Sequence, residues 1–263
     1  MSKFIAAMDN SGGSAGGVLD LYEQGWTDDD KMEKIHEFRL RMINSPDFNS
    51  NNIWAGIVYH DSVERGVVDV LLNKGISTIL KIDSGCESNG MLKDFDVHKM
   101  VDYALAKGCY GTKMRSVVKD KDTLVAIVGQ QFLLAEIIAA TNLIPIVEPE
   151  IPIDHAEKAD MENFLNDAIT SALKNYKGKC ILKLTIPETP NLYSHFAEHP
   201  KVERVVGLSG GYTTEEACNR LANNNNMSAS FSRALAEGLK FHQSDEEFNT
   251  VIGNNIQKIV SVS

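Results

Sequence analysis

Three features of the sequence predict an α/β fold, a single-domain (β/α)8 TIM barrel. Eight short apolar runs typical of buried strands recur along the chain. The segments between them have helical spacing, as at 97–105, where apolar residues fall at i, i+3, i+4, i+7 and i+8. After a long first connection, successive runs start about 24 to 37 residues apart, the length of a strand with its return helix. Eight such units favour a closed barrel over residues 1–263 rather than an open sheet.

The strands are expected, in order, at 5–9, 53–59, 78–83, 109–115, 143–150, 180–185, 204–209 and 228–232. Pro145 lacks an N–H, so we expect it at the beginning of its strand. A Ser or Thr followed three residues later by Glu indicates helix starts at Thr213 and Ser244. The acidic run 28–30 indicates another start. The asparagines at 223–226 predict a helix end and turn, because Asn tolerates left-handed backbone.

The composition argues against several classes of protein. The formal net charge is −10, whereas nucleic acids and anionic membranes attract basic surfaces, so neither is an expected partner. No apolar run approaches the roughly 20 residues of a membrane span, and the start of the chain does not have the pattern of a secretory signal. We therefore expect a cytoplasmic protein whose four cysteines are buried, reduced thiols. No histidine or cysteine has metal-ligand spacing, and His60 is expected to be structural.

Charged and polar residues occur at the carboxyl ends of most expected strands, where barrels of this kind carry their active sites. Residues at i and i+2 share a face of a strand, and barrel strands have no solvated face because helices cover the outside. We therefore expect a functional mouth rather than an inert network of salt bridges. The residues concerned are Asp9, Lys81, Asp83, Lys113, Arg115, Glu148, Glu150, Lys183, Ser209 and Arg233.

Lys183 has the most apolar surroundings of any lysine in the sequence, Cys-Ile-Leu-Lys-Leu-Thr-Ile. Desolvation there favours the free amine, and a neighbouring cation such as Lys113 acts in the same direction. Lys183 is therefore a candidate Schiff-base nucleophile. Dehydration of a carbinolamine needs a general acid, which Glu148 supplies if burial favours its protonated form. A purely structural pairing of Lys183 with Glu148 stays open.

Two glycine-rich segments predict anion binding. Ser209-Gly210-Gly211 precedes the helix expected from Thr213, and glycines let backbone N–H groups approach an anion at a helix start. Arg233 in the next loop adds a forked contact for phosphate. The segment 10–14, Asn-Ser-Gly-Gly-Ser, follows the first strand. A substrate with a phosphate at each end fits this pair of loops.

With these residues assembled, the sequence resembles the class I (Schiff-base) fructose-1,6-bisphosphate aldolases, and is most similar to their shorter microbial forms. The resemblance covers about 4–239. It implies a metal-independent, cofactor-free lyase of glycolysis and gluconeogenesis that reversibly cleaves fructose 1,6-bisphosphate to dihydroxyacetone phosphate and glyceraldehyde 3-phosphate. Seven motifs carry it in the same order: IAAMDNSGGS (5–14), LKIDSG (80–85), GTKMRS (111–116), PIVEPEI (145–151), ILKLTIP (181–187), LSGGY (208–212) and ASFSRAL (229–235).

The resemblance also implies roles for the matched residues. Lys183 forms the imine, Glu148 transfers protons during its formation and hydrolysis, and Asp9 takes the hydroxyl proton during cleavage. Lys113 holds developing oxygen charge, and Glu150 orients the lysines. The phosphate on the dihydroxyacetone side is bound by Ser209, Gly210 and Arg233. The other phosphate and nearby hydroxyls are held by Lys81, Ser11 and Ser14, while Arg115 assists at the mouth.

The chain departs from the animal enzymes at two points. Asn10 stands where the vertebrate-type segment has an acidic residue, and the sequence ends at Ser263 without their long C-terminal tail, so we assign no tail tyrosine to proton exchange. Two alternatives stay open: a Schiff-base aldolase for another phosphorylated ketose, such as a 1-phosphate or a tagatose isomer, and a non-catalytic phosphosugar-binding or scaffolding protein. A homo-oligomer is also open, with Trp26 or the 155–176 segment serving as core or as interface.

Overall fold

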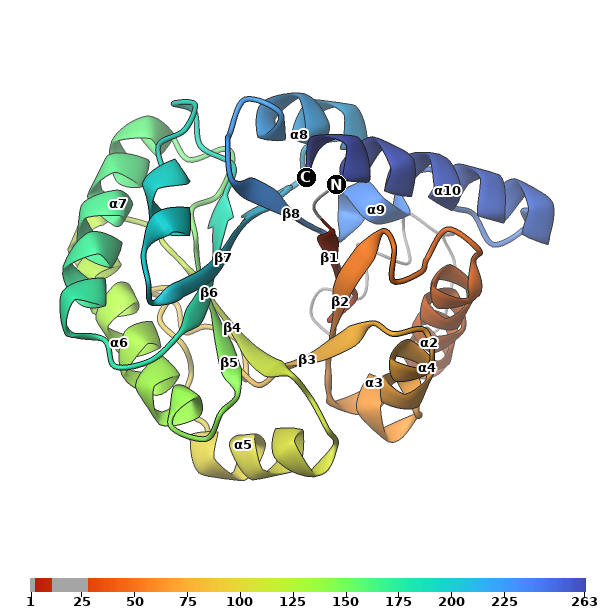
Figure 1. Cartoon of the computed structure of the whole chain (residues 1–263), viewed down its shortest axis with the longest axis horizontal. Helices are drawn as coiled ribbons and strands as arrows, with labels where there is room; N and C mark the ends of the chain where they lie inside the picture. Colours follow the sequence, from red (N-terminus) through yellow and green to blue (C-terminus); the bar gives the residue numbers. More distant parts are fainter. Residues whose placement is uncertain (1–2, 11–27) are drawn as a thin grey trace.

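The computed structural model describes residues 3–10 and 28–263, and its centre is a closed barrel of eight parallel strands (Figure 1). Each strand pairs with the next along the chain, and the last pairs with the first. The predicted fold is confirmed, and every strand lies within two residues of its predicted bounds. The strands are β1 (Phe4–Ala7), β2 (Ile53–Val58), β3 (Ser77–Lys81), β4 (Gly111–Val117), β5 (Ile144–Glu150), β6 (Cys180–Thr185), β7 (Val202–Leu208) and β8 (Met227–Phe231).

Helices surround the barrel (Figure 1). The connection between β6 and β7 is an exception to the predicted alternation, because it holds only a 3-10 helix, η1 (Ser194–Glu198). Prolines at 187, 190 and 200 interrupt this connection, which leaves little room for an α-helix. The other helices are α2 (Asp28–Asn44), α3 (His60–Glu64), α4 (Val67–Asn73), α5 (Val97–Ala106), α6 (Lys121–Ala139), α7 (Lys158–Asn175), α8 (Thr214–Leu221), α9 (Arg233–Ala236) and α10 (Asp245–Val262).

Most of the predicted helix ends and turns are confirmed. The Thr213 hydroxyl accepts the N–H of Glu216, and Ser244 forms a full capping box with Glu247. Asn226 has a left-handed backbone, with φ of 62°. Helix α2 starts at Asp28, the first residue of the acidic run. Trp26, considered above as a core or interface residue, lies outside the described residues. The predicted apolar stripe of α5 is wrong at one position, because Leu105 is 45% exposed.

Pro145 is the second residue of β5, as expected from its missing N–H. The pairing of β5 with β6 begins only at Ile146, one residue later. The proline therefore costs no main-chain bond on that side of the strand.

The inside of the barrel is filled by small and branched side chains that alternate along the strands: Ile5, Ala7, Ala55, Ile57, Ile79, Ile146, Ile181 and Val206. Two residues after several of these comes a charged one, as in Ala7 to Asp9, Ile79 to Lys81 and Ile181 to Lys183. Because alternate residues of a strand face the same way, the charged side chains stand directly above the apolar filling. This alternation positions the candidate site.

Helix α6 is, among the described residues, long and apolar enough to cross a membrane by length and composition, contrary to our expectation that no stretch comes near this. Core helices pass the same test, and Leu124, Ile127 and Val128 of α6 are buried.

All four cysteines are free. Cys109, Cys180 and Cys218 are buried as predicted, whereas Cys86 is half-buried.

Candidate active site

Apart from Asp83, the predicted mouth residues line one cavity of about 380 Å³ at the carboxyl ends of the strands. Ser11 and Ser14 lie outside the described residues, so the structure does not place them. The other ten predicted site residues all line this cavity: Asp9, Lys81, Lys113, Arg115, Glu148, Glu150, Lys183, Ser209, Gly210 and Arg233.

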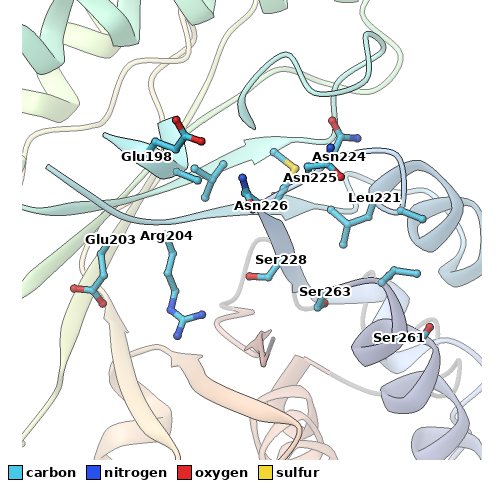
Figure 2. Close-up of a pocket in the computed structure, with 15 residues that line it drawn as sticks. Glu198, Glu203, Arg204, Leu221, Asn224, Asn225, Asn226, Ser228, Ser261 and Ser263 are labelled. Atoms are coloured by element: carbon cyan, nitrogen blue, oxygen red, sulfur yellow. The ribbon is translucent and has the colours of Figure 1, made fainter. Parts of the chain in front are cut away.

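A larger cavity, of about 690 Å³, opens at the opposite end of the barrel, where β7 and β8 begin (Figure 2). Its wall includes Arg204, Ser228 and the asparagines 224–226, together with the carboxyl ends of α8 and α10. None of the ten predicted site residues that the structure describes lines it. The smaller cavity is therefore the candidate active site.

Four side chains of alternating charge form a chain through the candidate site. The Nζ of Lys113 lies 2.9 Å from Asp9 Oδ2 and 3.0 Å from Glu148 Oε2. The Nζ of Lys183 lies 3.2 Å from Glu148 Oε1. The most exposed of the four side chains is Asp9, at 12%. Glu148 thus contacts both lysines, one through each oxygen, away from bulk water.

The charges of this chain fix two protonation states. Burial by itself would raise the pKa of Asp9, but Lys113 and then Lys183 hold that pKa well below its ordinary value. Burial would likewise lower the pKa of Lys113, but Asp9 and Glu148 raise it above its ordinary value. At neutral pH Asp9 is therefore a carboxylate and Lys113 an ammonium. Lys113 can stabilise negative charge but does not offer a free amine.

Side chains hold the strand ends at this point. The main-chain pairing of β5 with β6 ends at Val147 and Leu182. Beyond it, the Thr185 hydroxyl donates to Ile151 O at 2.6 Å and accepts the Ile151 N–H at 3.1 Å. From α6, the fully buried Gln131 accepts the N–H of Glu148 at 2.8 Å. The backbone that carries Glu148 is therefore fixed from the helix side.

Asp83 organises the β3 side of the site. It lies 3.2 Å from Lys81 Nζ and accepts the N–H groups of Gly85 and Arg115 at 3.0 and 3.2 Å. Its position two residues after Lys81 was the only sequence signal for this contact.

Arg115 pairs with Glu150; burial would lower the pKa of Arg115, but Glu150 raises it. Among the described residues Glu150 thus pairs with an arginine, not with a lysine as the resemblance implies.

The glycine loop after β7 has the backbone of an anion site. Gly210 and Gly211 have φ values of 60° and 123°, which favour glycine. A Cβ on Gly211 would lie 3.2 Å from Arg233 Nη2, so the guanidinium lies close against the glycine backbone. Helix α8 begins three residues later. Glycine backbone, helix start and arginine are thus gathered at one edge of the cavity.

Sequence reasoning missed other residues of the cavity wall: Ala7, Leu208, Ser230 and Ser232. Asn10, the first residue of the predicted 10–14 segment, also lines it. Ser230 lies in β8 and Ser232 lies one residue beyond its end, but small hydroxyl residues give no distinct signal. His60 does not line the cavity and stacks on the ring of Tyr103, in line with a structural role. No group of three metal-binding side chains occurs in the part of the chain that the structure describes.

A buried lysine paired with a carboxylate at the mouth of a (β/α)8 barrel is suited to Schiff-base chemistry. No family model matches the chain. A curated protein of Synechocystis sp., named fructose-bisphosphate aldolase class 1, is 43% identical over an alignment of 279 residues. The alignment covers 99% of this chain and 93% of the relative. The chain therefore belongs to the class I fructose-bisphosphate aldolase family.

Two solved structures agree with the fold. The fructose-bisphosphate aldolase of Plasmodium falciparum, in complex with TRAP and a small-molecule inhibitor, has a TM-score of 0.81 at 18% identity over 99% of this chain and 90% of its own. An archaeal fructose 1,6-bisphosphate aldolase has a TM-score of 0.63 at 12% identity over 98% and 94%. At these identities the likenesses show the fold alone.

Proposed function

We propose that the chain reversibly cleaves fructose 1,6-bisphosphate into dihydroxyacetone phosphate and glyceraldehyde 3-phosphate through an imine at Lys183. The observation that carries the proposal is the buried chain of alternating charges from Asp9 through Lys113 and Glu148 to Lys183. The name of the curated relative supports the same reaction.

Imine formation uses the pair of Lys183 and Glu148. A proton that passes from the ammonium to the carboxylate over 3.2 Å leaves a free amine beside a carboxylic acid. The amine attacks the substrate ketone, and a proton passes from its nitrogen to the new alkoxide to give the carbinolamine. The acid then protonates the carbinolamine hydroxyl, so that the C–O bond breaks and water leaves a protonated imine. The Lys113 ammonium, 3.0 Å from Glu148, stabilises negative charge on the oxygen during attack.

Cleavage uses Asp9, which Lys113 keeps ionised. The carboxylate takes the proton of the C4 hydroxyl while the C3–C4 bond breaks. The bonding electrons move into the protonated imine to form an enamine, and the aldehyde product leaves. Protonation of the enamine and hydrolysis of the imine, again with Glu148, release dihydroxyacetone phosphate and restore Lys183.

The remaining polar residues of the cavity hold the two phosphates. Ser209, Gly210 and Arg233 bind the phosphate next to the ketone, at the glycine loop. Lys81, with Ser11 and Ser14, holds the other phosphate. Arg115 assists at the mouth, and Glu150 positions it through their ion pair. The proposal includes no metal and no cofactor, so EDTA is expected to leave the activity unchanged.

Borohydride trapping tests the proposal. Reduction in the presence of dihydroxyacetone phosphate should attach the ligand to Lys183, which mass spectrometry identifies. Lys183→Met should lose both trapping and cleavage, whereas Lys179→Met, an exposed lysine just before β6, should keep both. Full cleavage activity in Lys183→Met would overturn the imine. Tight binding without turnover or trapping would favour a phosphosugar-binding protein instead.

Two further comparisons refine the proposal. Values of kcat/KM for fructose 1,6-bisphosphate, tagatose 1,6-bisphosphate and fructose 1-phosphate identify the preferred ketose. Val125, Leu133 and Phe164 on the outer helices are exposed, which supports a homo-oligomer, and sedimentation velocity at micromolar concentration tests it. Four free cysteines support a cytoplasmic location, because that compartment keeps thiols reduced.

A further inference from the structure

Arg39 of α2 reaches from the outer ring of helices to the end of β1. Its Nε donates to Met8 O at 2.8 Å, and its Nη2 donates to Asn10 O. These two carbonyls stand immediately before and after Asp9 in the chain. Only 2% of Arg39 is exposed. A single buried guanidinium therefore holds the carbonyl oxygens of both residues adjacent to the candidate base.

The hydrogen bonds from Arg39 hold the chain beyond the point where the strand pairing of β1 ends. Strand β1 ends at Ala7, and the Met8 N–H still bonds to Ile57 O at 2.9 Å. Arg39 supplies donors to carbonyls beyond that point, and its planar fork sets their relative orientation. Holding the carbonyl oxygens of Met8 and Asn10 restrains the backbone on both sides of Asp9 and hence the direction of its Cα–Cβ bond. The carboxylate is thereby aimed at Lys113, 2.9 Å away.

Burying the charged guanidinium of Arg39 is energetically unfavourable, so a specific interaction must hold it in place. Burial lowers the pKa of Arg39 to about 10, and its buried Nη1 has no hydrogen-bond partner among the described residues. A buried cation needs compensation. Attraction to the Asp9 carboxylate supplies part of it, and the guanidinium also lies 5.3 Å from the centre of the Tyr59 ring. The unfavourable burial of the Arg39 charge is thus partly offset by the carboxylate that Arg39 positions.

We propose that Arg39 is a positioning residue that orients the Asp9 carboxylate for proton transfer during carbon–carbon cleavage. The inference rests on the proposed function, in which Asp9 acts in cleavage but not in imine formation. It therefore separates two measurable steps. Borohydride trapping of dihydroxyacetone phosphate needs Lys183 and Glu148, whereas cleavage of fructose 1,6-bisphosphate also needs Asp9.

The experiment compares Arg39→Met, Arg39→Lys and Arg41→Met with wild type in both assays. Arg41 is a matched control, because it lies on the same helix and its guanidinium also donates to two backbone carbonyls, those of Phe241 and Gln243, away from the cavity. In Arg39→Met we expect the kcat of cleavage to fall about 10- to 100-fold, the cost of a misplaced catalytic group. Its KM and its trapping rate should stay within about twofold of wild type. Arg41→Met should keep both steps.

Arg39→Lys keeps the charge but has no planar fork, so its kcat should lie between those of Arg39→Met and wild type. This variant also serves if Arg39→Met fails to fold. Wild-type kcat in Arg39→Lys, or a cleavage loss in Arg39→Met matched by an equal loss of trapping, would overturn the positioning role. Failure of the proposed function looks different: wild-type protein would then show no trapping, or Asp9→Asn would retain cleavage.

Discussion

Lys183 Nζ lies 3.2 Å from Glu148 Oε1, and this ion pair stands at the first position beyond the main-chain pairing of their two strands. The last main-chain pair is Val147 with Leu182. The side chains of 148 and 183 therefore meet just above the last main-chain pair of their strands. Both side chains line the cavity, directly above the apolar filling of the barrel, so a substrate in the cavity can reach the lysine.

Glu148→Gln tests whether this carboxylate transfers protons. The amide keeps the volume of the side chain and can still bond to Lys183, but it cannot carry a proton between amine and hydroxyl. We expect kcat to fall by about 10²- to 10⁴-fold, the usual contribution of a general acid–base. Borohydride trapping should slow by a similar factor. Glu215→Gln, on the exposed first turn of α8, is the control, and near-normal kcat in Glu148→Gln would contradict the role.

The Asp9 pair makes stability depend on pH in a defined direction. The pKa of Asp9 in the folded chain is below its ordinary value. Its contribution to the free energy of unfolding is therefore complete above the unfolded pKa of about 3.9 and is lost as the pH falls through the folded pKa.

Thermal melts between pH 6 and pH 2 should accordingly show a steeper fall below about pH 4 in wild type than in Asp9→Asn. Other carboxyls with lowered pKa, such as Glu188 and Asp120, are common to both proteins and cancel in the difference. Parallel curves for the two proteins would show that Asp9 is not linked to folding.

Much of the site was predictable because strand alternation is a local property. Ala7 to Asp9 and Ile181 to Lys183 each place a charge two residues beyond the interior filling. Pairings between elements were not predictable in this way. The sequence does not show that Glu150 meets Arg115, or that Arg39, thirty residues from Asp9, turns inward from α2. Such contacts depend on how helices pack on the barrel, for which sequence spacing has no signal.

Gly211→Ala tests the anion site at the glycine loop. The residue has φ of 123°, and the new Cβ would lie 3.2 Å from Arg233 Nη2. Backbone strain of about 1–3 kcal/mol and the displaced guanidinium should raise KM for fructose 1,6-bisphosphate about tenfold, with a smaller change in kcat. Gly66→Ala is the control, since its φ is 79° with nothing within 4 Å of the new Cβ, and Gly66 does not line the cavity. Equal KM effects in both variants would exclude a local role.

Gly129→Ala is expected to stabilise the chain without altering catalysis. Gly129 lies inside α6, and nothing lies within 4 Å of an added Cβ. Alanine loses less backbone entropy on folding, so we expect a gain of about 0.5–1 kcal/mol in the free energy of unfolding. Val125 and Leu133, one turn away on either side, are 69% and 68% exposed and can pack on the new methyl. Urea unfolding at two protein concentrations measures the gain. A loss of stability that grows with concentration would instead mean that a second copy covers this face of α6 and that the glycine is needed for close approach.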